Sequence, residues 1–193
     1  MSDASDDKVV VPFTLHREQF TKDPQYAPLF YDALGRVVVV WGRYEHLLTA
    51  HLRVALNVAG FFGIKGEIRN SLKAKVDLIQ DLYTKLAILA EQAPELIRIT
   101  DEAKNLGEDR NLLIHSQVDG FQDGDPPRIK MVHHGHSKGQ MKITELAPDI
   151  ATIGSVAGHA HRLLNEQMPY FLLLLEDHKK VVKNFELEPK LNR

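Results

Sequence analysis

An arginine, an asparagine and a histidine stand close together in an apolar part of the sequence, at Arg110, Asn111 and His115. An imidazole is the side chain that can accept or donate a proton near neutral pH. A guanidinium carries a fixed positive charge and can donate two parallel hydrogen bonds to a carboxylate or a phosphate. An amide can orient either group. These residue types are suited to acid–base chemistry beside an anionic group, provided that one element holds them together.

The segment that carries these residues has the pattern of an amphipathic helix. Apolar residues at three-and-four spacing predict a helix from about 94 to 116 with one buried stripe, formed by Leu96, Ile99, Ala103, Leu106, Leu113 and Ile114. Arg110 falls inside that stripe. At about 100° per residue, Asn111 lies at the edge of the stripe and His115 lies further round. We therefore predict that Arg110 points into the protein and that His115 points away from it.

A buried arginine needs an anionic partner, and the first long helix offers one. In a helix from about 28 to 59, Glu45 follows Trp41 by four residues and precedes Leu48 by three, in the middle of the apolar stripe. We predict that Glu45 pairs with Arg110. The pair would be a structural ion pair between two helices, or one that also orients a catalytic group; a slightly rotated helix would leave Glu45 exposed. Trp41 is expected in the core rather than as a stacking platform.

The remaining elements must hold these two helices together. Helical spacing predicts a second helix from about 71 to 93 and a last helix from about 149 to 185, which Pro169 should kink or divide. Between 118 and 146 the apolar period changes to two, which predicts a β-hairpin inserted before the last helix. The expected fold class is all-α, an up-and-down bundle of four to five helices with one hairpin insert.

The length of 193 residues and the 44% hydrophobic content are sufficient for one well-buried domain. We expect a helical domain at 28–187, between an N-terminal arm at 1–27 and a C-terminal tail at 188–193. The run Leu172–Leu175 is apolar on all sides of a helix, which indicates deep burial or a subunit interface. We favour the interface, and so a homodimer.

The net charge of −2 argues against a protein that coats nucleic acid with lysine, so any nucleic-acid contact must be local. The candidates for contact with RNA are the basic residues of the predicted hairpin: Arg128, Lys130, Lys138 and Lys142. The hairpin also holds His133, His134 and His136, which could supply zinc ligands. No carboxylate in the stretch is placed to orient them, so we expect a solvated turn and no metal.

The sequence contains no cysteine, which removes disulfides and thiolate metal sites and fits a reducing compartment. Its N-terminus is acidic and polar where a signal peptide would be basic and then apolar. No apolar run approaches the length needed to cross a membrane. We expect a soluble, cytoplasmic protein that has no contact with the membrane.

The motif in its helical setting resembles the HEPN superfamily. The signature of these helical bundles is an arginine, commonly followed by a polar residue, with four to six residues between it and a histidine near the end of a late helix. Arg110, Asn111 and His115 match it, with four residues between the arginine and the histidine. The early helix with Trp41 and Glu45, the strand-like insert and the long last helix are similar to the wider layout, so the resemblance loosely covers most of the chain.

The resemblance implies a metal-independent endoribonuclease that works as a dimer and needs no cofactor. RNA carries its own nucleophile, so cleavage by the 2′-hydroxyl needs a base, an acid and positive donors for the phosphate. Two copies of His115 would supply the base and the acid, while Arg110 holds phosphate oxygens and Asn111 orients the imidazole or the phosphate. Glu45 and Ser116 would support them. The biological role would be that of a toxin or of an enzyme of RNA processing or defence.

The alternative is a catalytically inactive, dimeric binding or scaffold module with a protein partner such as an antitoxin. In that module Arg110 and Glu45 form a structural ion pair, and His115 caps the carbonyl groups at the end of its own helix. If Glu45 holds Arg110, the arginine cannot reach a phosphate unless the pair opens. The geometry of these three residues therefore separates the two interpretations.

Overall fold

The computed structural model describes residues 23–137 and 140–187. The predicted tail at 188–193, Lys138 and all but the last five residues of the predicted arm lie outside them. The described chain forms α1 (Ala27–Phe61), α2 (Leu72–Lys85), the 3-10 helix η2 (Ala87–Leu89), α3 (Ala93–Ile114), β1 (Gln117–Gln122), β2 (Arg128–Ser137), β3 (Gln140–Leu146) and α4 (Ile150–Leu187). The mostly helical class with a β insert before the last helix is confirmed, although the insert has three strands rather than two.

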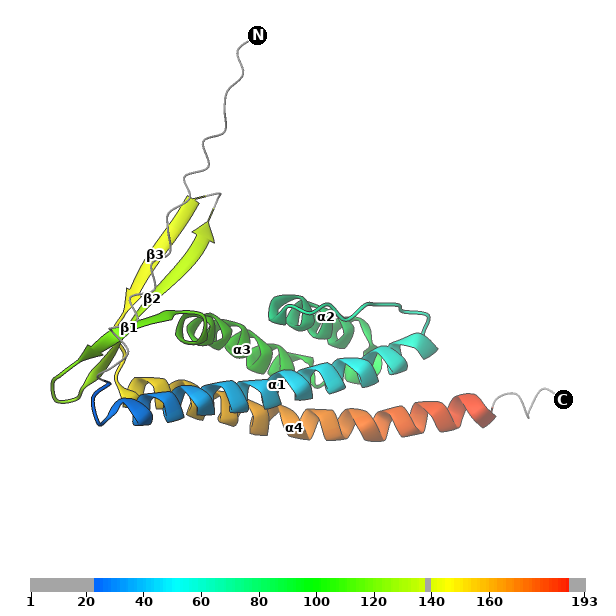
Figure 1. Ribbon diagram of the computed structural model, residues 1–193. Helices are drawn as coiled ribbons and strands as arrows, with labels where there is room; N and C mark the ends of the chain where they lie inside the picture. The colour runs from blue at the N-terminus through cyan, green and yellow to red at the C-terminus, as the bar shows by residue number, and fades with distance from the viewer. Residues whose placement is uncertain (1–22, 138–139, 188–193) are drawn as a thin grey trace, which may run out of the picture.

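The two longest helices, α1 and α4, lie side by side, and α2 and α3 cover one face of this pair (Figure 1). The imidazole of His51 lies beside Gln167, and ten residues further along α1 the ring of Phe61 lies 5.0 Å from that of Phe185. Both partners advance in the same direction. The helices α1 and α4 are therefore parallel, and both begin near the sheet.

Helix α3 runs in the opposite direction to its two neighbours. Along α2, the side chain of Asp77 contacts Lys104 and that of Gln80 contacts Asp101, so α2 and α3 are antiparallel. The ion pairs between α3 and α4 give the same result for that pair. It follows that α2 runs in the same direction as α1. The predicted up-and-down order is wrong at this connection, because residues 62–71 return along the bundle before α2 begins.

Local capping explains where two of the helices begin. The hydroxyl of Ser71 accepts a hydrogen bond from the backbone N–H of Ala74 at the start of α2. The carboxylate of Asp149 accepts one from the N–H of Thr152 at the start of α4, which lowers the pKa of Asp149. Pro169 lies inside α4 and does not divide it. None of the described helices has both the length and the apolar character that crossing a membrane requires.

The core contains one buried polar cluster that the apolar pattern did not predict. His51 is fully buried, with its Nε2 atom 2.6 Å from the hydroxyl of Tyr83 and its Nδ1 atom 3.3 Å from the amide nitrogen of Gln167. Burial lowers the pKa of His51 to about 3, so this imidazole is neutral at pH 7. Trp41 is only 2% exposed, which confirms its prediction as a core residue.

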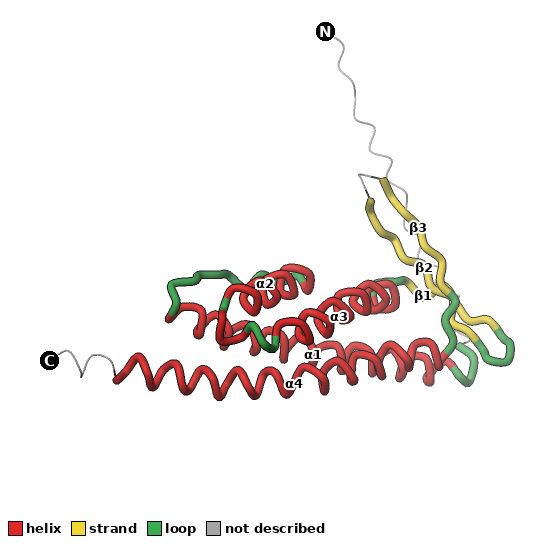
Figure 2. Tube along the Cα trace, turned by 180° about the vertical axis from the view of Figure 1, so that it is seen from behind, coloured by secondary structure: helices red, strands yellow, loops and turns green. Residues whose placement is uncertain are grey.

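The sheet has the strand order β1-β2-β3 with both pairs antiparallel, and the β2–β3 hairpin projects away from the helices on the side of α2 and α3 (Figure 2). Ile129 and Met131 of β2 point into the core. The register between β1 and β2 shifts between Val118 and Gly120, and Gly120 has a φ of 146°. This irregularity breaks the period-two pattern of β1, which explains why the strand was not predicted.

Candidate active site

The three residues of the motif lie together at the C-terminal end of α3. The Nη1 atom of Arg110 donates to the Oδ1 atom of Asn111 over 2.9 Å and lies 3.2 Å from the Nε2 atom of His115. The prediction that Arg110 and His115 point apart is therefore wrong. The helix ends at Ile114, and His115 occupies the cap position with φ −101° and ψ 7°. An ideal helical wheel no longer gives the direction of its side chain there.

The contact between Arg110 and His115 fixes the form of the imidazole in this arrangement. A guanidinium has only donors, so the Nε2 atom of His115 must accept the hydrogen bond. The ring is then neutral, with its proton on Nδ1. His115 and Asn111 are exposed, whereas Arg110 is half-buried and its Nε atom is buried without a hydrogen-bond partner among the described residues. The cluster is open to solvent on the imidazole side.

Two carbonyl groups in the last turn of α3 accept hydrogen bonds that do not involve the imidazole ring. The backbone N–H of His115 donates to the carbonyl of Asn111 over 3.0 Å, and the hydroxyl of Ser116 donates to the carbonyl of Leu112. Within the described chain, no hydrogen bond joins the imidazole ring of His115 to a carbonyl group. Ser116 thus has a local capping role, and the ring is left to contact Arg110.

Glu45 does not pair with Arg110. Its Oε1 atom accepts a hydrogen bond from the indole Nε1–H of Trp41 over 2.9 Å, and the ion pairs of the described residues include none between Glu45 and Arg110. The predicted ion pair is therefore wrong. The reason lies one turn earlier on α3, where Gly107 faces Trp41. A Cβ atom at Gly107 would lie 3.4 Å from the indole ring and 2.6 Å from a methyl group of Leu72.

The motif segment borders one stretch of α1. At one end of this stretch Trp41 meets Gly107, and at the other end the ring of Tyr31 lies 6.2 Å from that of Phe121 in β1. The chain between Gly107 and Phe121 contains the whole motif. The part of α1 between Tyr31 and Trp41 therefore runs beside it. That part carries two exposed valines, Val38 and Val39, which are 45% and 54% exposed.

The sheet does not bring the predicted RNA-contact residues to one surface. Arg128 and Lys130 alternate with the buried Ile129 and Met131, so both lie on the outer face of β2. Lys142 pairs with Gly135, which shares the opposite face with Met131. The guanidinium of Arg128 also donates to the carbonyl of Ala147 over 3.2 Å. Lys138 lies outside the described residues.

The histidines of the hairpin do not form a metal site within the described residues. His133 and His134 are consecutive in β2 and so point to opposite faces of the sheet. The side chain of His136 is outside the described part of the structure. No group of three His, Asp or Glu side chains in the part that is described could hold a metal ion.

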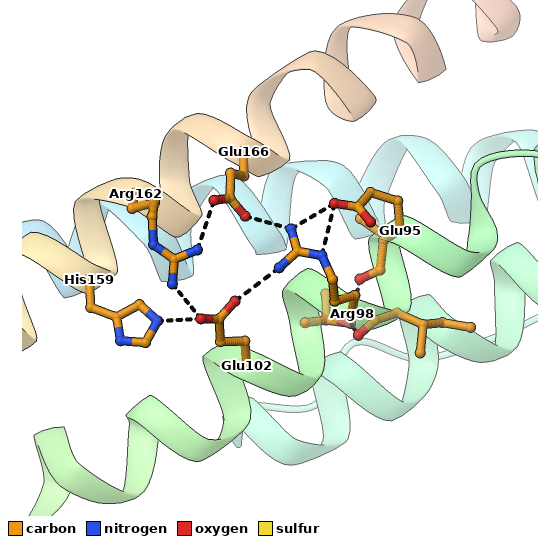
Figure 3. Close-up of polar contacts among 9 residues, drawn as sticks. Glu95, Arg98, Glu102, His159, Arg162 and Glu166 are labelled. Carbon is orange, nitrogen blue, oxygen red and sulfur yellow. Dashed lines mark hydrogen bonds and ion pairs between the residues drawn. The ribbon is translucent and has the colours of Figure 1, made fainter.

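A network of ion pairs joins the first half of α3 to α4, and the apolar pattern of the sequence does not predict it. Figure 3 shows its members: Glu95, Arg98, Glu102, His159, Arg162 and Glu166. A hydrogen bond from Arg162 lowers the pKa of Glu102, and one from Arg98 lowers the pKa of Glu166. The network fixes α3 against α4 and so holds the helix that carries the motif. Arg98 of α3 therefore has acidic partners, whereas Arg110 of the same helix has none among the described residues.

Comparisons of the chain with protein-family models, with curated proteins and with solved structures find no match. Function is therefore inferred from the geometry around Arg110 and His115 and from the chemistry of these side chains, and the resemblance to the HEPN superfamily stays a prediction.

Proposed function

We propose that this protein is a metal-independent endoribonuclease of the HEPN type, active as a homodimer. The observation that carries the proposal is the contact of Arg110 with Asn111 and His115 at an exposed helix end, with no carboxylate on the arginine among the described residues. A cation beside an exposed imidazole is the pairing that RNA cleavage needs. Because no described carboxylate pairs with Arg110, its positive charge is available to a phosphate.

The present contact also indicates how a substrate would use the site. A phosphate that binds the guanidinium of Arg110 replaces the imidazole as the acceptor of its hydrogen bond. The Nε2 atom of His115 is then free to accept the proton of the 2′-hydroxyl. The 2′-oxygen attacks phosphorus, Arg110 stabilises the charge on the phosphate oxygens, and the bond to the 5′-oxygen breaks. The products carry a 2′,3′-cyclic phosphate and a 5′-hydroxyl.

The leaving 5′-oxygen needs a proton from a second acid, and one chain offers one motif histidine. A two-fold dimer supplies the second through His115 of the other copy. Val38 and Val39 are exposed on the part of α1 that runs beside the motif, and we place the dimer contact there. Leu172 and Leu173 are also exposed, at 54% and 49%. These two leucines follow Phe171, whose ring packs on His51. Since His51 lies ten residues after Trp41 on α1, the leucines are further from the motif than Val38 and Val39 are.

An inactive module would use Arg110 and His115 differently. It depends on an ion pair between Arg110 and Glu45 and on a cap formed by the imidazole of His115. Neither contact occurs in the described part of the chain, and the indole of Trp41 and the hydroxyl of Ser116 make the corresponding hydrogen bonds. The cost of holding Arg110 at a half-buried position without an anion is more readily explained by a site that binds one.

The test is cleavage of single-stranded RNA by the full chain in the presence of a chelator. We expect products that end in a cyclic phosphate, and a loss of about 10²–10⁴-fold in rate for His115→Ala, since one acid–base group contributes this much. Size-exclusion chromatography with light scattering must show that the variant stays dimeric. His161→Ala, which removes an exposed histidine of α4, is the matched control. Full activity of His115→Ala would exclude the site.

A further inference from the structure

A concave surface lies between α1 and α2. The hollow has a volume of about 310 Å³ and is lined by α1 from Gly42 to Arg53 and by Lys75 of α2. It includes the side chains of Glu45 and His46. None of these residues belongs to the motif, and the sequence pattern did not single out the three basic ones, because they come from two helices.

The charges that line this hollow favour an anion. Arg53 and Lys75 form no ion pair with any described residue, and His46 adds an imidazole at the same surface. The one carboxylate there, that of Glu45, already accepts the indole N–H of Trp41. Two fixed positive charges against one carboxylate leave the concave site net positive, and neither cation is held in an ion pair by a described residue, so the site is suited to a phosphate group.

The hollow is connected to the motif through a short series of contacts. Glu45 lines the hollow and bonds Trp41, Trp41 lies against Gly107, and Arg110 follows Gly107 by one turn of α3. From Thr49, in the middle of the hollow, to Trp41 the rise along α1 is roughly 12 Å, and from Gly107 to His115 along the antiparallel α3 it is roughly another 12 Å in the same direction. The separation of roughly 24 Å along the bundle corresponds to a few nucleotides of an extended strand, so one RNA molecule can occupy both sites.

We propose that the hollow of His46, Arg53 and Lys75 is a second phosphate-binding subsite, which holds the RNA strand a few nucleotides from the bond that is cleaved. This inference rests on the proposed function, because it assigns the hollow to the same substrate. The hollow begins at Gly42, one turn of α1 beyond Val38 and Val39. It therefore lies at the rim of the proposed dimer surface, where a strand can leave the site.

The test measures RNA binding in the His115→Ala background, so that the substrate stays intact. Fluorescence anisotropy compares a 15-nucleotide single strand with a trinucleotide, for Arg53→Gln/Lys75→Gln and for the matched pair Arg43→Gln/Lys73→Gln. The control pair removes the same two charges from α1 and α2 at exposed positions outside the hollow. Circular dichroism and thermal unfolding show whether each variant is folded.

We expect the hollow variant to bind the long strand about tenfold more weakly, and its plot of log affinity against log salt to be shallower by about 1.4, as for two lost contacts with single-stranded phosphate. The trinucleotide and the control pair should show no such change. Equal losses for the two double variants would overturn the subsite. The subsite would also be overturned if the hollow variant lost affinity for an acidic peptide and not for RNA.

The proposed function and the subsite can fail separately. If the wild-type chain cleaves RNA and the hollow variant keeps full affinity, the subsite is wrong and the nuclease stands. If the wild-type chain binds the long strand through the hollow but cleaves nothing, the subsite stands and the nuclease is wrong. If the chain binds no RNA at all, both are overturned.

Discussion

Helix α3 carries Arg98 in its first half and Arg110 near its end, and the two side chains have opposite surroundings. The guanidinium of Arg98 lies 2.6 Å from Glu95, 3.1 Å from Glu102 and 2.7 Å from Glu166. The guanidinium of Arg110 meets only neutral groups among the described residues, an amide oxygen and an imidazole nitrogen. One arginine is saturated with anions and the other has none.

This difference separates a structural cation from a cation that is available to a ligand. Every donor that Arg98 offers to α4 is used within the protein, so a phosphate would have to displace carboxylates to reach it. A phosphate that reaches Arg110 displaces only a neutral imidazole, which then becomes free to act as a base. The same residue type on the same helix thus has two roles, because Glu95 and Glu102 of α3 and Glu166 of α4 surround Arg98, whereas no described carboxylate pairs with Arg110.

The largest effect that would test this comparison is on catalysis. Arg110→Ala should lower kcat by about 10²–10³-fold, as for the loss of one donor to a developing oxyanion, and should leave the melting temperature nearly unchanged. Arg98→Ala should leave kcat unchanged. Arg110→Lys should keep part of the rate, because lysine retains the charge but not the two parallel donors. Steady-state cleavage of one RNA oligonucleotide measures all three, and equal losses at both arginines in folded proteins would end the distinction.

A smaller effect on catalysis is expected from the surface beside Arg110. Val39→Glu places a charge at the two-fold interface that we propose, so the chain should become monomeric and lose the acid of the second copy, about 10²-fold in rate. Leu172→Glu, on the other exposed apolar surface, is the control and should stay dimeric and active. Light scattering and cleavage measured on the same samples give the answer. If the Val39→Glu variant stays dimeric and active, the proposed location of the interface is wrong.

At Arg98 the expected effect is on stability. Arg98→Met keeps the aliphatic part of the side chain and removes the charge, so the melting temperature should fall by about 3 °C while cleavage is unchanged. Glu166 remains paired with Arg162 in this variant, which limits the loss. The same substitution at Arg110 should change the melting temperature much less, since no ion pair is lost there. Calorimetry of both variants at neutral pH compares them directly.

The periodicity of the sequence predicted the elements but not the contacts at their ends. Three-and-four spacing located the four helices, and a period of two located the β2 and β3 strands, because burial of one face is a property of each element alone. The strand β1 was missed since Gly120 interrupts its alternation. The direction of α2 depends on a return of the chain after Phe61, which no local pattern encodes.

The residue types of the sequence predicted which side chains form the candidate site. The predicted directions of these side chains were wrong. The helical wheel placed Arg110 toward Glu45 and away from His115, because it treats the helix as continuous and compares only angles. In the structure α3 ends before His115, and Gly107 rather than Arg110 faces Trp41. The partners of Arg98 and the residues of the hollow come from different helices. Their proximity is a tertiary property that requires the packed structure.

The smallest predicted effect is the acid dependence of the Arg98 network. The pKa of Glu102 is lowered mainly by Arg162, and that of Glu166 mainly by Arg98, from an ordinary value of 4.5. A carboxylate with a lowered pKa stabilises the fold above its unfolded pKa, and this stability is lost as the pH falls through the folded pKa. The difference in melting temperature between wild type and Arg98→Met should therefore be constant from about pH 7 to about pH 5 and shrink below about pH 4.5.

The difference between the two proteins is the quantity to measure, because His51 adds an acid dependence of its own. Its pKa of about 3 lies below the ordinary 6.5, so the unfolded chain binds a proton first and stability falls as the pH drops below about 6.5. This contribution is present in wild type and in Arg98→Met, and it cancels when one melting temperature is subtracted from the other. Calorimetry of the two proteins across this range isolates the network. A difference that stays constant into the acid range would show that Arg98 acts through packing rather than charge, and the contrast with Arg110 would then lose its electrostatic basis.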